Sequence, residues 1–230
     1  MLKPSLEKVK ALAKQYNTIP VFYEFSADNQ TPLNIYTALS KDSRNSFILE
    51  SVSNGVQWDR YSFVGVSPKE EICITGNTAE IRTGDKIETK EVEQPIAFLK
   101  ERMAAYRSPV LEDAPNFTGG LIGYFGYDTV RYMEKKLTHV PEDDIHMPDC
   151  HLFLYEELLA YDHLTSNGIV ILNLHTDGDL GAQYAAAQWR AEELADIVRH
   201  YNPQPQVRQH HGESVVRSNL TKEQYSQMVR

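Results

Sequence analysis

The 230-residue sequence has few cysteines and no long apolar run. Two cysteines, Cys73 and Cys150, cannot form a disulfide framework, so a reducing compartment is expected. No segment approaches the ~18 uncharged apolar residues that a membrane helix needs, and we expect no membrane partner. The first residues carry charges throughout and lack the apolar core of a signal peptide. Together these absences predict a cytoplasmic location.

Positive charge is also scarce. The chain has 23 Lys and Arg against 32 Asp and Glu, which gives a net charge of −9 at pH 7. Binding to nucleic acid needs a clustered basic surface, so no nucleic-acid partner is expected. The apolar fraction of 41% is that of an ordinary globular protein, and the chain is long enough for a substantial core.

Motifs of the common catalytic sites are missing as well. The glycine-rich stretch 119–126 lacks the GxG of a dinucleotide loop, and no GxxxxGK followed by Ser or Thr occurs. No serine stands in a GxSxG elbow. Cys73 and Cys150 have no CxxC partner, which favours buried apolar residues over metal ligands. The residues alone indicate no catalytic group and no metal ligand.

Four glycines mark the stretch GGLIGYFGYD, which begins at Gly119. Glycine inside a strand usually permits a bulge or the close approach of another backbone. We therefore predict a core strand that packs tightly against another sheet, followed by a helix with Asp128 as its N-cap.

Hydrophobic periodicity predicts a mixture of helices and strands. Helices are expected over residues 5–16, 95–106 and 179–201, and another is expected to start at Thr31-Pro32. Strands are expected over residues 19–25, 45–52, 60–66, 70–76, 78–84, 85–92, 150–163 and 168–176. Asn54-Gly55, Gly76-Asn77 and Gly84-Asp85 are hairpin signals, so antiparallel pairing and an α+β fold are predicted. Residues 202–219 resemble a linker.

One hairpin combines an anion, a hydroxyl and a cation. ILESVSNGVQWDRYSFVG spans residues 48–65 and contains Glu50, Ser51 and Arg60. These groups could hold a zwitterionic amino acid, with Arg60 or backbone amides directed at its carboxylate. The structural alternative is a solvated cross-strand pair of Glu50 and Arg60.

Three blocks resemble the N-terminal domain of anthranilate synthase component I: FILESVSNGVQWDRYSFVG, FTGGLIGYFGYDTVRYME and MPDCHLFLYEELLAYDH. The resemblance covers nearly the whole chain. It implies an α+β fold whose mostly antiparallel sheets pack orthogonally between outer helices. It also implies that residues 1–217 are this N-terminal domain, and that 218–230 open a truncated chorismate-binding catalytic domain.

The resemblance further implies a function. The intact enzyme would be a lyase that makes anthranilate from chorismate, with ammonia supplied by a glutamine amidotransferase subunit. Chorismate and Mg²⁺ would bind in the missing domain, so this fragment would be inactive alone. Ser51, Glu50 and Arg60 would belong to the site for the feedback inhibitor L-tryptophan. Aminodeoxychorismate synthase component I and a free-standing amino-acid-binding module are the alternatives.

Overall fold

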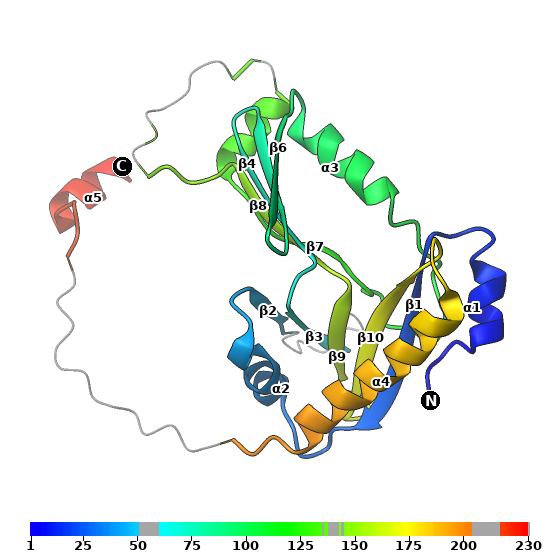
Figure 1. The fold of residues 1–230 in the computed structure, drawn as a ribbon. Coiled ribbons are helices and arrows are strands. Elements are labelled where there is room, and N and C mark those ends of the chain that lie inside the picture. Colours follow the sequence, from blue (N-terminus) through cyan, green and yellow to red (C-terminus); the bar gives the residue numbers. More distant parts are fainter. Residues whose placement is uncertain (51–59, 135, 138–142, 144, 204–216, 230) are drawn as a thin grey trace.

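The fold consists of two five-stranded antiparallel sheets with helices on their outer faces (Figure 1). The computed structural model describes residues 1–50, 60–134, 136–137, 143, 145–203 and 217–229. The helices are α1 (Leu6–Leu12), α2 (Pro32–Leu39), α3 (Pro95–Ala104), α4 (Leu180–Arg199) and α5 (Lys222–Met228), and the 3₁₀ helices are η1 (Ser40–Asp42) and η2 (Tyr127–Tyr132). None of the described helices has the length and apolarity needed to span a bilayer.

The first sheet, which we name sheet A, has the strand order β1-β10-β9-β3-β2. Its strands are β1 (Thr18–Ser26), β2 (Ser46–Leu49), β3 (Tyr61–Val66), β9 (Glu157–Asp162) and β10 (Asn167–His175). The longest pairing joins β1 to β10, from Thr18 opposite His175 to Ser26 opposite Asn167. The complete sheet A therefore needs both of these distant segments.

The second sheet, sheet B, has the strand order β6-β5-β4-β8-β7. Its strands are β4 (Glu70–Thr75), β5 (Thr78–Thr83), β6 (Lys86–Glu91), β7 (Gly120–Phe125) and β8 (Cys150–Tyr155). Gly76 and Gly84 begin the two tight turns of this sheet, with φ of +56° and +58°. Glycine supplies the positive φ needed at the first position of such a turn. The hairpins predicted at these two glycines are confirmed, while Asn54-Gly55 lies outside the described residues.

Two bends carry the chain from one sheet into the other. β3 leads into β4 through residues 67–69, where Ser67 has a φ of +53°, and β8 leads into β9 through the single residue Glu156. Strands that change sheet at a bend form the corners of orthogonal packing. The predicted α+β class, with mostly antiparallel sheets between outer helices, is confirmed.

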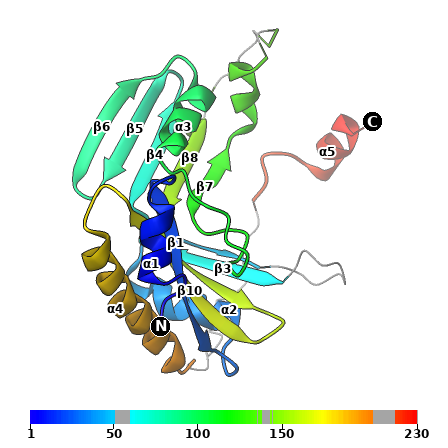
Figure 2. The same cartoon turned by 90° about the vertical axis from the view of Figure 1, so that its right-hand side faces the viewer.

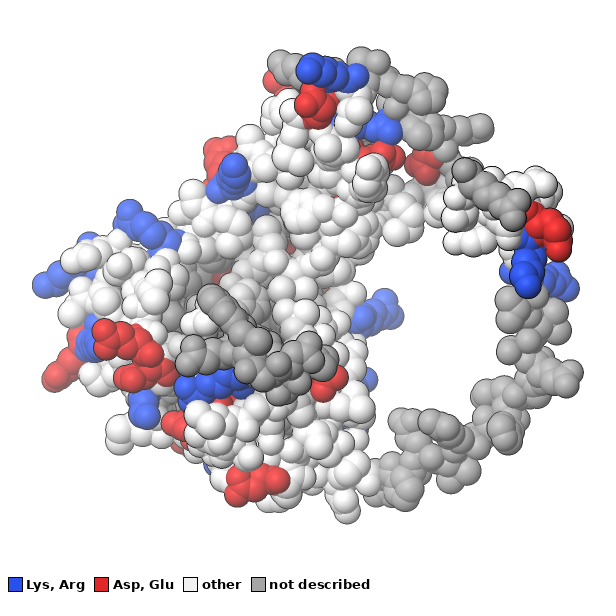
Figure 3. Space-filling view, turned by 180° about the vertical axis from the view of Figure 1, so that it is seen from behind, with Lys and Arg blue, Asp and Glu red and all other residues white. Residues whose placement is uncertain are grey.

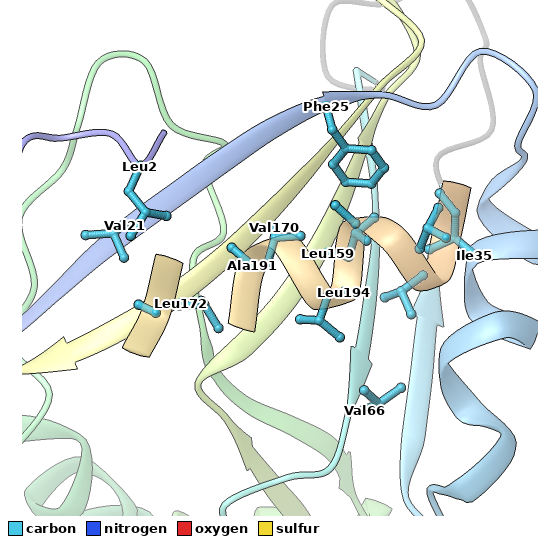
Figure 4. Close-up of a cluster of buried hydrophobic side chains, with 14 of the residues drawn as sticks. Leu2, Val21, Phe25, Ile35, Val66, Leu159, Val170, Leu172, Ala191 and Leu194 are labelled. Carbon is cyan, nitrogen blue, oxygen red and sulfur yellow. The ribbon is translucent and has the colours of Figure 1, made fainter. Parts of the chain in front are cut away.

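Three apolar clusters join these layers. One lies between sheet A and helices α1, α2 and α4, and its buried members include Val21, Ile35, Val170 and Leu194 (Figure 4). A second lies between sheet B and α3 and includes Ile72, Leu99 and Leu152. The third draws residues from both sheets, among them Phe22, Tyr155, Leu158 and Ile171. Burial of each large side chain contributes roughly 1.5–3 kcal/mol, so these clusters hold the sheets and helices in place.

Two local predictions were wrong. Residues 150–163 were expected to form one strand, but the bend at Glu156 divides them into β8 in sheet B and β9 in sheet A. An apolar run is compatible with one long strand or with two, because both would bury the same side chains. Asp128 was expected to cap a helix, but η2 begins after Gly126 without a side-chain cap. Asp128 instead accepts a hydrogen bond from the Arg131 guanidinium at 2.8 Å.

Candidate functional site

The β2–β3 hairpin carries the residues for which the sequence predicts a regulatory role. β2 lies at the edge of sheet A and pairs with β3, with Leu49 opposite Phe63. Glu50 follows β2 directly and is exposed, and Arg60 stands directly before β3. Ser51 lies within residues 51–59, outside the described part of the chain, so its role stays a prediction.

Arg60 forms a two-pronged ion pair with Asp162, the last residue of β9. Its Nε and Nη2 donate to Oδ1 and Oδ2 of Asp162 at 3.0 and 2.7 Å. β3 and β9 are neighbours, with Tyr61 opposite Asp162, so the pair joins adjacent strands. Arg60 thus has an acidic partner across the sheet, but this partner is Asp162 rather than Glu50.

The Asp162 carboxylate is buried and surrounded by donors. Only 3% of its side chain is exposed. The backbone N–H of Leu164 donates to Oδ1, and the Thr165 hydroxyl donates to Oδ2, each at 3.0 Å. Burial raises the pKa of Asp162, but the hydrogen bonds from Arg60, Leu164 and Thr165 outweigh it and lower the pKa below its ordinary value. The carboxylate is therefore charged at neutral pH and fixes the Arg60 guanidinium in place.

Arg60 keeps a part of its guanidinium open to an approaching ligand. Its side chain is 47% exposed, and Cζ lies 4.9 Å from the centroid of the Tyr61 ring. Asp162 occupies Nε and Nη2, which leaves Nη1 without a hydrogen-bond partner among the described residues. A ligand carboxylate could accept from Nη1 while the ion pair stays intact.

Two more polar residues lie beside the ion pair. The buried Ser62 hydroxyl lies 2.8 Å from Nε2 of His163. Sequence reasoning found Arg60 but missed Asp162, Ser62 and His163. The available signal was an aspartate at the end of the apolar stretch ELLAYD, which many strand ends share.

The glycine-rich strand β7 shows close backbone approach, as predicted. A Cβ at Gly123 would overlap the carbonyl oxygen of His151 and lie 2.8 Å from Cα of Leu152. A Cβ at Gly119, where φ is +147°, would lie 2.9 Å from the Tyr155 carbonyl oxygen. However, β7 is the edge strand of sheet B and its backbone approaches β8 of the same sheet, so the prediction of a core strand was wrong. Packing toward the other sheet is confirmed for side chains, since Ile122 packs against the cluster shared by both sheets and a Cβ at Gly119 would lie 2.8 Å from Nδ2 of Asn173 in β10.

The cysteines pack as small side chains. Cys150 is fully buried in the cluster beneath α3, and burial raises the pKa of its thiol. Cys73 is half-buried, and its thiol pKa is also raised by burial and then by Glu80 and Glu71. Within the described residues, no group of three or more His, Cys, Asp and Glu side chains is placed to hold a metal ion. On the face shown in Figure 3, acidic and basic side chains are interspersed.

Known proteins resemble this chain over most of its length. A sequence profile described as chorismate binding enzyme matches residues 55–230. The chain belongs to the chorismate-binding enzyme family. This match confirms, at the level of the family, the resemblance carried by the LESV and GGLIGYFGYD blocks. The relatives described next show which members of the family the chain resembles.

Curated relatives of this family member are named as anthranilate synthases. It is 35% identical to "Anthranilate synthase component 1" of Acetivibrio thermocellus, over 100% of this chain and 47% of the relative. It is 37% identical to the protein of the same name from Pseudomonas aeruginosa, over 84% of this chain and 39% of the relative. "Anthranilate synthase alpha subunit 2, chloroplastic" of Arabidopsis thaliana is 32% identical, over 96% of this chain and 39% of the relative.

A solved structure of anthranilate synthase component I from Streptococcus pneumoniae TIGR4 is 26% identical. It matches with a TM-score of 0.47, over 76% of this chain and 36% of that chain. This member of the chorismate-binding enzyme family therefore spans less than half the length of the relatives named here.

Proposed function

We propose that this chain is the N-terminal region of the large subunit of an anthranilate synthase. The observation that supports this most is the 35% identity to an anthranilate synthase component 1 along the entire chain. The intact enzyme would convert chorismate and ammonia to anthranilate and pyruvate in cytoplasmic tryptophan biosynthesis. A glutamine amidotransferase, component II, would supply the ammonia.

Chorismate and Mg²⁺ would bind outside the N-terminal domain. We place this domain at residues 1–217 and the opening helix of the catalytic domain at 218–230, where α5 carries a capping box of Thr221 and Gln224. The family profile runs across this boundary and does not test it. We expect the 230-residue chain alone to make no anthranilate.

The hairpin end would form part of an L-tryptophan feedback site. The Arg60 guanidinium, held by Asp162, leaves Nη1 for the tryptophan carboxylate. The exposed Glu50 carboxylate could accept from the tryptophan ammonium group, and the Ser51 hydroxyl could bond either polar end. Residues outside this chain would complete the pocket. Inhibition then follows if tryptophan binds one conformation of the subunit better than another.

The product of the intact enzyme tests the proposed reaction. Chorismate with ammonia and Mg²⁺ should give anthranilate and pyruvate, which chromatography and fluorescence can identify. Accumulation of aminodeoxychorismate instead would favour the folate-pathway alternative. Turnover by the 230-residue chain alone would show that the active site was misplaced.

The Ser51→Ala variant of the intact enzyme tests the feedback site. Loss of one buried hydrogen bond should weaken tryptophan binding by ~1–3 kcal/mol. The tryptophan concentration for half inhibition should then rise roughly 5- to 150-fold, while uninhibited activity is kept. Ser51→Phe should abolish inhibition more fully because its ring fills the pocket. An unchanged inhibition curve for Ser51→Ala would rule out the assignment of Ser51.

A further inference from the structure

β6 and β7 lie at opposite edges of sheet B (Figure 2), and these two edges differ in their chemistry. β6 has the sequence KIETKE, with four charged residues among six, and every residue is exposed. β7 at the opposite edge has the sequence GLIGYF and carries no charge. Exposed edge strands usually carry charges, above all lysine, because charge opposes pairing with another chain. β6 has this protection and β7 lacks it.

The backbone of β7 offers a free row of donors and acceptors. The Gly126 N–H donates to the Asp149 carbonyl at 2.7 Å, which fixes the alternation of the β7–β8 ladder. Since residues of an antiparallel strand point their N–H and C=O alternately to either side, those of Leu121, Gly123 and Phe125 point away from β8. Among the described residues, no strand pairs with this outer side. An added strand would find matching groups there.

Exposed apolar side chains lie at the end of β7 and in the segments that follow it and precede β8. Phe125 is 54% exposed, Tyr127 94% and Met133 66%. Ile145 and Met147, which lie just before β8, are 73% and 57% exposed. Aromatic residues and methionine are enriched in the cores of interfaces, and large apolar patches on a surface usually mark contact sites. The edge and these side chains would bury apolar surface together under one partner.

We infer that the outer side of β7 pairs with a β-strand of the polypeptide that lies outside these 230 residues. This inference rests on the proposed function, in which the chain is one region of a longer subunit. The chain covers only 47% of the A. thermocellus relative, so more than half of that protein is available to supply the strand. The uncharged β7 sequence and its apolar surroundings call for an apolar strand. Sheet B would then extend across the two halves of the subunit.

Hydrogen exchange of the intact enzyme tests this pairing with a control inside the same sheet. The Val92 N–H donates to Asn77, so the alternation of the β5–β6 ladder directs the amides of Ile87, Thr89 and Glu91 to the outer side of β6. These outer β6 amides should exchange rapidly. The outer amides of β7 should exchange at least roughly 100-fold more slowly than those of β6, because a paired strand protects them. Equal, rapid exchange at the two edges would overturn the inference.

Proline variants test the same pairing by removing one outward N–H at each edge. Phe125 and Ile87 are matched, since each is apolar, 54% exposed and outward-facing in its ladder. Phe125→Pro should lower the melting temperature of the intact enzyme by several degrees more than Ile87→Pro does. Phe125→Ala measures the loss of the ring alone. If Phe125→Pro, after the effect of Phe125→Ala is subtracted, lowers the melting temperature no more than Ile87→Pro does, the pairing is contradicted.

Two further measurements separate the alternatives. If the protection of the β7 amides disappears on dilution and sedimentation shows dimers, the strand that pairs with β7 comes from a second copy of the chain. That result would overturn the inference that the strand belongs to the same polypeptide. The product assay decides the proposed function independently of the edge. Protected β7 amides in a protein that makes no anthranilate would refute the reaction and leave the pairing in place.

Discussion

Arg60 can serve a carboxylate of the protein and a carboxylate of a ligand at the same time. Asp162 holds Nε and Nη2 from the neighbouring strand, and Nη1 has no hydrogen-bond partner among the described residues. Fixing a long side chain before binding lowers the entropy that a ligand must overcome. At the residue scale, Asp162 therefore acts on the proposed site through the position of Arg60.

The Asp162→Asn variant should lower the free energy of unfolding by about 1–3 kcal/mol at pH 7, because the donors of Arg60 and Thr165 lose a charged acceptor. Half-exposure of Arg60 keeps the loss below that of a fully buried pair. The folded-state pKa of Asp162 lies below its ordinary value of 3.8. Its contribution is thus present above that value and is lost as the pH falls through the folded-state pKa.

Urea unfolding between pH 7 and pH 3 checks this prediction. The difference between the wild type and Asp162→Asn should shrink toward the acid end. Asp196→Asn is the matched control, because Asp196 forms an exposed pair with Arg199 one helical turn away. That control should change stability by less than about 0.5 kcal/mol. A loss that is the same at every pH would show that the Asp162 charge does not stabilise the fold.

At the scale of elements, the glycines of β7 differ in how much space surrounds them. A Cβ at Gly123 would overlap the backbone of β8, whereas the nearest atom to a Cβ at Gly120 is Cε2 of Phe117 at 3.8 Å. Gly123→Ala should therefore cost more stability than Gly120→Ala, by about 1–3 kcal/mol. For a domain of this size, that is roughly 2–12 °C in melting temperature. Equal melting temperatures would mean that β7 moves away from β8 at no cost.

Elements with a local chemical cause could be predicted from the sequence. The Thr31 hydroxyl accepts from the Asn34 N–H at 3.1 Å, as expected of a helix that starts at Thr31-Pro32. Gly76 and Gly84 marked their turns because only glycine readily adopts the required φ. The bend at Glu156 and the Arg60–Asp162 pair depend on contacts between residues far apart in sequence. No local pattern encodes such contacts, so both escaped prediction.

At the scale of the whole molecule, Glu156 joins both sheets. It stands at the bend from β8 to β9, and its Oε1 lies 2.8 Å from Nζ of Lys69, at the other bend, and 2.9 Å from Nε2 of His175, at the end of β10. Burial lowers the pKa of Lys69, but the hydrogen bond to Glu156 and the charges of Glu156, Tyr106 and Glu70 together outweigh burial and raise it. One carboxylate thus links the two corners of the fold.

The Glu156→Gln variant should lower the free energy of unfolding by about 0.5–2 kcal/mol, because a neutral amide replaces the carboxylate that accepts a charge-assisted bond from Lys69 and lies beside His175. Glu88→Gln is the control, since Glu88 is an exposed residue of β6 that pairs with Lys90 along the same strand. Thermal unfolding should show a clear shift for Glu156→Gln and little for Glu88→Gln. Matching shifts would mean that the corner carboxylate has no special role.

The pairing of β1 with β10 also determines how long β1 waits for its partner strand during synthesis on the ribosome. The last residue of β1 is Ser26, and the first residue of β10 is Asn167. At the usual pace of translation, the intervening chain takes roughly 7–30 s to emerge. During that interval, Ile19, Val21 and Phe25, which the finished fold buries, have no β10 to pack with. The nascent chain therefore presents its first strand to molecular chaperones long before its native neighbour exists.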